Sequence, residues 1–234
     1  NPEFTVMEIY VAYKDYRWMM DFTEKALAHI ALEVKGSYSF SVGGTEISFQ
    51  APFARVPILE AIKTHTGLDL LGKSEDEIRA AAKSVGVEVS DEMGSGKLID
   101  AIFGDRCEHH YVQPTFITDY PVEMSPLCKR HRDDDRLTER FELFINGKEI
   151  ANAYSELNDP IEQLERFEEQ LHLSAKGDDE AMFIDLDFVR ALEYGMPPTS
   201  GMGIGMDRLT MLLTDQSSIQ EVLFFPQMRP EKAD

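Results

Sequence analysis

The stretch Gly201-Met202-Gly203-Ile204-Gly205-Met206-Asp207-Arg208 predicts a strand that runs directly into a helix at Asp207. Alternate residues of a strand face opposite sides of a sheet, so the three glycines share one face. Such a face carries no side chains, which weakens the strand and is tolerated where something must lie close to the backbone. A flat ligand such as a purine fits there. The simpler interpretation, a glycine-rich strand packed under a helix, stays open at this point.

Arg208, three positions after this strand, also favours a ligand-binding role for the segment. Arg208 lies in the first turn of the expected helix, where the helix dipole disfavours a cation. A guanidinium at this place is well suited to contact a phosphate or to stack on a ring.

The first segment of the chain predicts a second informative strand, from Asn1 to Tyr13. Its odd-numbered positions from Thr5 to Val11 are largely apolar, whereas Phe4, Glu8 and Tyr10 share the opposite face. An acid flanked by aromatic residues on one sheet face suggests a pocket. The alternative is a half-exposed strand whose polar face is in water.

The composition excludes several classes of protein. The 234 residues include 43 acidic and 23 basic side chains, for a net charge of −20, and 43% are hydrophobic. This predicts one large or two small globular domains and excludes disordered and collagen-like chains. No apolar run approaches the roughly 20 residues of a membrane span, and no export signal is visible. We therefore expect a cytoplasmic protein without a membrane partner, which a pair of cysteines also favours.

The remaining patterns alternate between strands and helices without regular βαβ order. We expect a helix from Asp15 to Val34 ended by Gly36, a hairpin over 37–49 turning at Gly43-Gly44, and helices over 74–83, 97–103, 160–171 and 187–194, the last capped by Asp187. Further strands are expected over 111–122 and 141–145. The sequence thus predicts an α+β fold with a mostly antiparallel sheet flanked by helices and a helical insertion over about 58–105.

Glu149 and Glu156 are candidate magnesium ligands, because Mg²⁺ is often held by one or two carboxylates together with phosphate oxygens. Their spacing of seven places them on opposite faces of a regular strand. Either a β-bulge intervenes or the two side chains do not share a metal.

Two other motifs have less support. Gly94-Ser95-Gly96-Lys97 lacks the first glycine and the final hydroxyl residue of a phosphate-binding loop, so we reject it as one. Cys107, His110, Cys128 and His131 have the composition of a zinc site. We expect instead buried thiols and solvated histidines at the two ends of a strand.

Together these motifs resemble the class II lysyl-tRNA synthetases. Residues 1–13 are similar to the second half of motif 2 of that class, residues 201–208 to motif 3, and residues 147–160 to the metal and lysine segment of the family. The segments 193–199 and 225–230 also fit on either side of motif 3. The resemblance covers nearly the whole chain and implies the class II synthetase fold, with residues 1–234 as the C-terminal part of the catalytic domain.

The resemblance implies ATP-dependent activation of lysine to lysyl-adenylate and transfer to the 3′ end of tRNA(Lys), in the cytoplasm, by a homodimer. Phe4 and Arg208 would stack on the two faces of adenine, and Arg208 would also lie near the γ-phosphate. Gly201, Gly203 and Gly205 would form the floor of the nucleotide site.

The same resemblance implies roles for the carboxylates. Glu149 and Glu156 would bind Mg²⁺, with Glu156 also close to the ATP and catalytic together with Arg208. Glu8 and Tyr10 would receive the lysine side chain with help from Asn158.

The resemblance also implies parts that would lie upstream of Asn1. These are motif 1 with its dimer interface, the Arg-x-Glu strand that contacts the α-phosphate, and the anticodon-binding barrel. We therefore expect residues 1–234 to hold about half of the active site and to be incomplete for activity on their own.

Three alternatives follow from the same residues. A lysine ligase of the same class that modifies elongation factor P shares the opening Asn1-Pro2-Glu3-Phe4-Thr5, although residues 12–16 and 201–205 fit the tRNA enzyme better. Aspartyl and asparaginyl relatives are disfavoured because Glu8 would repel an acidic side chain. The third alternative is an inactive binding or regulatory remnant of the fold.

Overall fold

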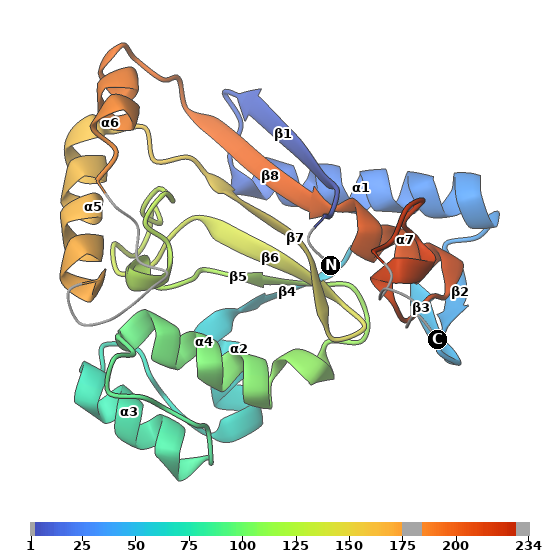
Figure 1. The fold of residues 1–234 in the computed structure, drawn as a ribbon, viewed down its shortest axis with the longest axis horizontal. Helices are drawn as coiled ribbons and strands as arrows, with labels where there is room; N and C mark the ends of the chain where they lie inside the picture. The colour runs from blue at the N-terminus through green and yellow to red at the C-terminus, as the bar shows by residue number, and fades with distance from the viewer. Residues whose placement is uncertain (1–2, 175–183, 228–234) are drawn as a thin grey trace, which may run out of the picture.

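The computed structural model of the protein describes residues 3–174 and 184–227 (Figure 1). Its strands are β1 (Val6–Ala12), β2 (Ser39–Val42), β3 (Thr45–Ser48), β4 (Ala54–Pro57), β5 (Thr115–Thr118), β6 (Arg140–Ile145), β7 (Lys148–Ser155) and β8 (Thr199–Gly205). Its α-helices are α1 (Tyr16–Lys35), α2 (Ile58–Thr66), α3 (Glu75–Ser84), α4 (Ser95–Arg106), α5 (Pro160–Ser174), α6 (Leu186–Glu193) and α7 (Met206–Thr214).

The main sheet has six strands in the order β1-β8-β7-β6-β5-β4. Neighbouring strands are antiparallel except for β4 and β5, which are parallel. A parallel pair needs a crossover connection, and here the chain between the two strands contains α2, α3 and α4. The result is a mixed sheet with helices, consistent with the α+β class.

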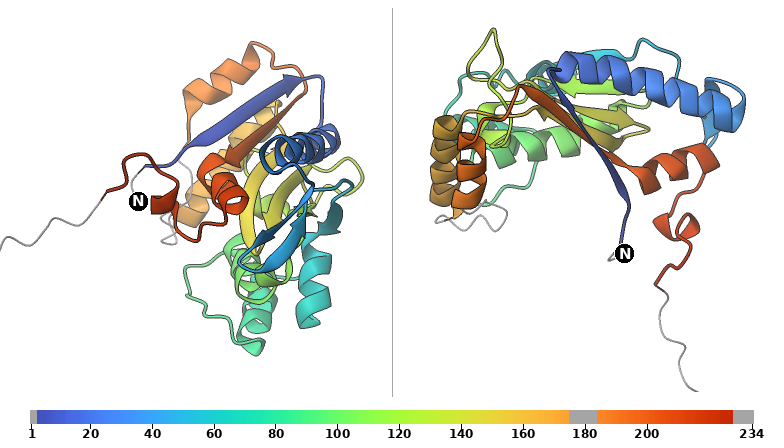
Figure 2. Two further views of the ribbon diagram at one scale, coloured as in Figure 1. Left: turned by 90° about the vertical axis from the view of Figure 1, so that its right-hand side faces the viewer. Right: turned by 90° about the horizontal axis from the view of Figure 1, so that it is seen from above.

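Helix α1 forms where the sequence predicts it. Asp15 caps its start by accepting a hydrogen bond from the Trp18 amide at 3.1 Å, and Gly36 ends it with a φ of 70°. The helix lies across one face of the sheet (Figure 2). Its buried face belongs to a core cluster with apolar side chains of β6, β7 and β8, among them Leu143, Ala153 and Met202.

The predicted hairpin is also present, as the separate two-stranded sheet of β2 and β3. Gly43 and Gly44 have φ values of 57° and 81° at its turn, which is the conformation that a tight two-residue hairpin requires.

Helices α2, α3 and α4 share a second apolar cluster with Ile117 of β5 and Phe144 of β6. Ser74 and Glu77 form the expected capping box at the start of α3. Helix α4 begins at Ser95, earlier than predicted, with Gly94 as its N-cap. A Cβ on Gly96 would stand 3.0 Å from the carbonyl oxygen of Glu123, so this glycine allows close packing of α4.

Several predicted boundaries were wrong. Asp185, not Asp187, caps α6 by accepting a hydrogen bond from the Phe188 amide. The strand expected over 111–122 is limited to β5, because 3₁₀ turns occupy Glu108–His110 and Val122–Met124. The first strand starts at Val6, and the structure does not describe Asn1 and Pro2.

The two faces of the main sheet differ in what covers them. The α1 face is closed by the first cluster. On the opposite face, the cluster of α2, α3 and α4 covers the β5 side, where Ile117 and Phe144 lie. The part formed by β7, β8 and β1 borders the cleft described below. None of the helices in the described ranges is long and apolar enough to span a membrane.

Candidate active site

A β-bulge in β7 sets the geometry of the site. Leu143 of β6 pairs with Ala151, but the next residue, Phe144, pairs with Glu149, so Ile150 is the extra residue. The bulge reverses the alternation of side chains along β7. Glu149 therefore lies on the same face as Glu156, as the first of the two alternatives for this pair required.

The strand register brings the predicted residues to one face. Glu8 pairs with Gly203, and Gly203 pairs with Asn152. Tyr10 pairs with Gly201 in the same way, and Gly201 pairs with Tyr154. Directly paired residues point to the same side of a sheet, so these side chains surround the glycines on the face opposite α1.

A cleft lies at the Gly205 end of this face, where the resemblance implies a nucleotide site, and is called the nucleotide cleft after that expectation. It has a volume of about 490 Å³, and its lining includes Phe4, Glu149, Gly203, Gly205 and Arg208. A Cβ on Gly203 would find only one neighbour within 4 Å, Cγ1 of Val6 at 3.5 Å. The glycine face is thus open at Gly203, and the structure brings Phe4 and Arg208 to one cleft.

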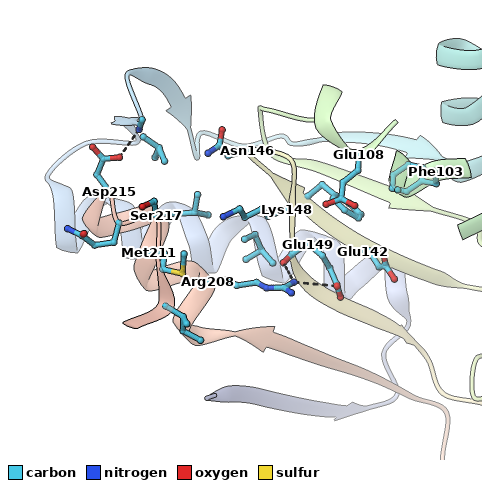
Figure 3. A pocket seen from close by; sticks show the side chains of 18 of the residues that line it. Phe103, Glu108, Glu142, Asn146, Lys148, Glu149, Arg208, Met211, Asp215 and Ser217 are labelled. Carbon is cyan, nitrogen blue, oxygen red and sulfur yellow. Dashed lines mark hydrogen bonds and ion pairs between the residues drawn. The ribbon is translucent and has the colours of Figure 1, made fainter. Parts of the chain in front are cut away.

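A larger cavity of about 920 Å³ adjoins the nucleotide cleft and shares Glu149, Ile150 and Arg208 with it (Figure 3). It extends between the turn of the β2–β3 hairpin, α4 and α7. Phe103, Phe144 and Met211 contribute apolar lining to it.

Arg208 is fixed against β7 in this structure. Its Nη1 donates to the carbonyl oxygen of Glu149 at 2.6 Å and lies 3.5 Å from Oε2 of the same residue (Figure 3). Burial raises the pKa of Glu149, the negative charge of Glu142 adds to this, and Arg208 opposes it. The pair places a cation and a carboxylate at the junction of the two cavities.

Sequence reasoning missed the hydrogen-bonded group around Glu142, whose negative charge acts on Glu149. Glu142 accepts hydrogen bonds from Arg140 at 2.5 Å and from the Tyr120 hydroxyl at 2.8 Å. Arg140 also donates to Asn152 at 3.2 Å. Hydrogen bonds to one another thus fix these four side chains. In the sequence, only the alternation of small and polar residues over 151–154 could have suggested that Asn152 and Tyr154 face the site.

At the other end of the glycine face lie Tyr10 and Glu156, two of the residues for which the resemblance implies a role in substrate or metal binding. The Tyr10 hydroxyl donates to Oε2 of Glu8 at 3.2 Å. An added Cβ on Gly201 would stand 2.1 Å from Oε1 of Glu156 and 2.7 Å from Cε1 of Tyr10. Burial raises the pKa of Glu156 to about 7. A phenol and one carboxylate therefore lie beside Gly201, and the phenol hydroxyl reaches a second carboxylate, that of Glu8.

Asn158, two residues beyond Glu156, has both ends of its side-chain amide hydrogen-bonded. Lys129 donates to its Oδ1 at 2.8 Å, and its Nδ2 donates to the carbonyl oxygen of Met196 at 3.0 Å. The side chain is therefore oriented before any ligand arrives.

Glu149 and Glu156 can each offer one carboxylate to a separate magnesium ion that phosphates help to hold. Seven residue steps along a strand separate their Cα atoms by roughly 20 Å, too far for both carboxylates to bind one ion directly. Among the described residues, no group of three or more His, Cys, Asp or Glu side chains is placed to hold a metal. Mg²⁺ commonly takes only one or two carboxylates and completes its shell with phosphates and water, so this donor set is sufficient.

The four Cys and His residues of the other candidate metal site have separate surroundings. Cys107 is buried in the cluster of α2, α3 and α4, whereas Cys128 forms a β-bridge with Glu156. His110 stacks on His65 with ring centroids 4.1 Å apart, and His131 lies 3.2 Å from the Tyr16 hydroxyl.

A family model described as tRNA synthetases class II (D, K and N) matches residues 1–229. The chain is 68% identical over 232 residues to the lysine–tRNA ligase of Porphyromonas gingivalis strain W83, covering 99% of this chain and 40% of that protein. It is equally similar to the lysine–tRNA ligase of Christiangramia forsetii, at 68% identity with 99% and 41% coverage. The lysine–tRNA ligase of Azobacteroides pseudotrichonymphae is 63% identical over 234 residues, which is 100% of this chain and 47% of that protein. The chain thus spans less than half the length of these relatives.

Proposed function

This chain belongs to the class II tRNA synthetases of the D, K and N group, and from that premise we propose that it forms the ATP- and lysine-binding part of a lysine–tRNA ligase. The observation that carries the proposal is the glycine face of β8. It has the nucleotide cleft at the Gly205 end, Tyr10 beside Gly201 at the other end, and Glu8 beside Gly203 between them.

The proposed reaction has two steps. A carboxylate oxygen of lysine attacks the α-phosphorus of ATP, the bond from that phosphorus to the bridging oxygen breaks, and pyrophosphate leaves. A terminal hydroxyl of tRNA(Lys) then attacks the carbonyl carbon of lysyl-adenylate, and AMP leaves. The protein contributes chiefly by holding the reacting groups in line.

Phe4 and Arg208 would enclose the adenine over the glycine floor. Both line the nucleotide cleft, and Arg208 also borders the larger cavity, where the γ-phosphate would lie. The guanidinium is suited to both contacts because it is planar and permanently charged.

Glu149 and Glu156 would hold Mg²⁺ at opposite ends of the glycine face, each ion sharing phosphate oxygens and water. When bound, Mg²⁺ supplies positive charge that stabilises the triphosphate and the leaving pyrophosphate. The chain's own contribution is to fix Glu149 through Arg208 and to hold the Glu156 carboxylate over Gly201.

Glu8 and Tyr10 would bind the lysine ammonium group. An ammonium carries three donors and a full charge, and a carboxylate with a phenol oxygen can accept from it. Glu8 pairs with Gly203 in the sheet register, so the side chain of lysine would point along β1 while its carboxylate approaches the nucleotide.

The relatives are more than twice as long as this chain, so we propose that the complete protein supplies the remaining parts. Residues 1–234 would be the C-terminal part of the catalytic domain, with residues 58–105 as a helical insertion. The α-phosphate arginine, the dimer interface of a homodimer and the anticodon-binding barrel would come from other residues, and the complete enzyme would act in the cytoplasm.

Aminoacylation by the complete protein tests this proposal. With ATP, Mg²⁺ and labelled lysine, we expect label on tRNA(Lys), dependent on all three components. The same assay with elongation factor P in place of tRNA should give no labelled protein. Label on the elongation factor and none on tRNA would assign the chain to the other lysine ligase, and no label on either would leave only a binding role.

A further inference from the structure

We propose that Asp207 is a positioning residue that fixes Phe4 across the nucleotide cleft from Arg208. This inference rests on the proposed function, because it concerns how the same cleft is prepared for the adenine of ATP. It assigns a role to the residue between the glycine strand and Arg208.

Two hydrogen bonds tie the start of β1 to the start of α7. The backbone N–H of Thr5 donates to Oδ2 of Asp207 at 2.6 Å, and the N–H of Met206 donates to the carbonyl oxygen of Thr5 at 3.0 Å. Both lie beyond the last ladder pair of the two strands, Val6 with Gly205. They therefore extend the pairing of β1 and β8 into the first turn of α7.

Phe4 depends on this junction for its position. Its side chain is 69% exposed, so packing holds the ring weakly. The residue precedes β1, and Thr5 is its direct neighbour along the chain. Fixing the Thr5 amide therefore limits where the Phe4 ring can lie. Because Asp207 directly precedes Arg208, one junction sets the distance between the two side chains that would enclose the base.

The position of the Asp207 carboxylate calls for an explanation, because this residue lines a cleft proposed for a triphosphate. A negative charge near phosphates weakens their binding by repulsion. The first turn of a helix stabilises an acid, and a carboxylate accepts a backbone N–H more strongly than a neutral group does. The side chain is only 9% exposed, so its acceptor function is directed inward to Thr5.

A double-mutant cycle in the complete protein tests the inference. We expect Phe4→Ala to raise the KM for ATP about tenfold, as loss of one base-stacking contact would. Asp207→Ala should raise it about fivefold or more and leave kcat and the KM for lysine within about twofold. In the double variant, Asp207→Ala should raise the KM for ATP less than about twofold beyond the effect of Phe4→Ala alone. The two effects are not additive, because Asp207 acts through Phe4.

Asp185→Ala is the matched control. Asp185 caps α6, and its Oδ1 accepts a backbone N–H from Phe188 at 2.9 Å. Its removal breaks the same kind of hydrogen bond at the start of another helix, and Asp185 lines neither the nucleotide cleft nor the larger cavity. We expect it to lower the melting temperature about as much as Asp207→Ala does while the KM for ATP stays within about twofold.

The outcomes separate this inference from the proposed function. If Phe4→Ala weakens ATP binding but Asp207→Ala multiplies that effect in full, the positioning role is wrong and the nucleotide site stands. If Phe4→Ala changes nothing, both are wrong. An equal rise in the KM for lysine would also contradict a role confined to Phe4.

Two further measurements apply even if Asp207→Ala does not fold. Asp207→Asn keeps an acceptor oxygen, so the KM for ATP should rise less than about threefold. Amide hydrogen exchange on the unmodified protein should show the Thr5 amide protected at least about tenfold relative to the Phe4 amide. Equal exchange of the two amides would overturn the proposal.

Discussion

The carboxylate of Glu156 lies directly against Gly201, and a Cβ at that glycine would stand 2.1 Å from Glu156 Oε1. Such a distance is far inside van der Waals contact, so a side chain at this position would force the Glu156 carboxylate to move. Gly203, two residues further along the same face, has only ordinary contact with Val6 at 3.5 Å. Two glycines of one strand thus have different reasons to lack a side chain.

Replacing these glycines should separate two kinds of defect. Gly201→Ala displaces the Glu156 carboxylate and the Tyr10 ring, so we expect kcat for adenylate formation to fall about 10²-fold, as misplacement by about 1 Å can cause. Gly203→Ala fits the empty protein but narrows the nucleotide floor, so it should mainly raise the KM for ATP. Steady-state pyrophosphate exchange with both variants measures the difference. If the two variants changed kcat and the KM for ATP in the same way, separate roles for Gly201 and Gly203 would be contradicted.

Glu156 should make folding stability depend on pH. Burial raises its pKa from the model-compound value of 4.5 to about 7 in the folded state. The folded protein therefore binds the proton more tightly than the unfolded chain, and this contribution to stability is present below pH 4.5 and lost as pH rises through 7. Its size is on the order of 2 kcal/mol after allowance for partial exposure.

Urea unfolding at pH 5 and pH 8 measures this effect. Between these two values, Glu156→Gln should lose less stability than the parent, by on the order of 2 kcal/mol, because the amide does not ionise. Glu33→Gln, an exposed change on α1, is the control and should follow the parent. Parallel behaviour of all three proteins would contradict the raised pKa.

Glu149→Gln should affect catalysis far more than folding. Its ion pair with Arg208 joins side chains that are 41% and 53% exposed, and such pairs contribute less than about 1 kcal/mol to stability. We expect the Mg²⁺ concentration for half-maximal pyrophosphate exchange to rise about tenfold or more, as expected for loss of a charged magnesium ligand. Arg140→Gln is an informative contrast, because it leaves the partly buried Glu142 without its cation and should destabilise the fold instead.

The two cysteines should not hold zinc. Burial raises the pKa of Cys107 to about 11 and of Cys128 to about 12, so both stay protonated near neutral pH. A thiol must lose its proton to bind a metal. Elemental analysis after purification in metal-free buffer should find far less than one zinc per chain, and a chelator should leave the melting temperature unchanged. Stoichiometric zinc that Cys128→Ala removes would contradict this.

Local patterns predicted the parts of the site that lie within single strands. The alternation of side chains placed Phe4, Glu8 and Tyr10 on one face of the first strand and the three glycines on one face of the last strand. The pairing of β1 with β8 brings these two sets to the same side of the sheet. A bulge between Glu149 and Glu156 was one of two alternatives that followed from their spacing, and its place at Ile150 did not follow. The bulge depends on which residues of β6 lie opposite, and a single strand does not carry that information.

Contacts between distant segments were not predictable in this way. The Thr5–Asp207 bond joins residues 202 positions apart, and the support of Glu142 by Tyr120 joins two segments across the sheet. The cap of α6 is Asp185 rather than Asp187. Residue type could not decide between them, because both are aspartates and lie two positions apart. Such choices depend on the final backbone path rather than on residue type.

The amino acid that is activated tests the central claim most directly. Pyrophosphate exchange by the complete protein, run with each of the twenty amino acids, should be strongest with lysine. Glu8→Gln removes one charged partner of the ammonium and should lower kcat/KM for lysine roughly 30-fold or more, while the KM for ATP stays nearly constant because Phe4 and Arg208 are untouched. A preference of the parent for aspartate or asparagine, or full lysine activity of the Glu8→Gln variant, would contradict the lysine assignment.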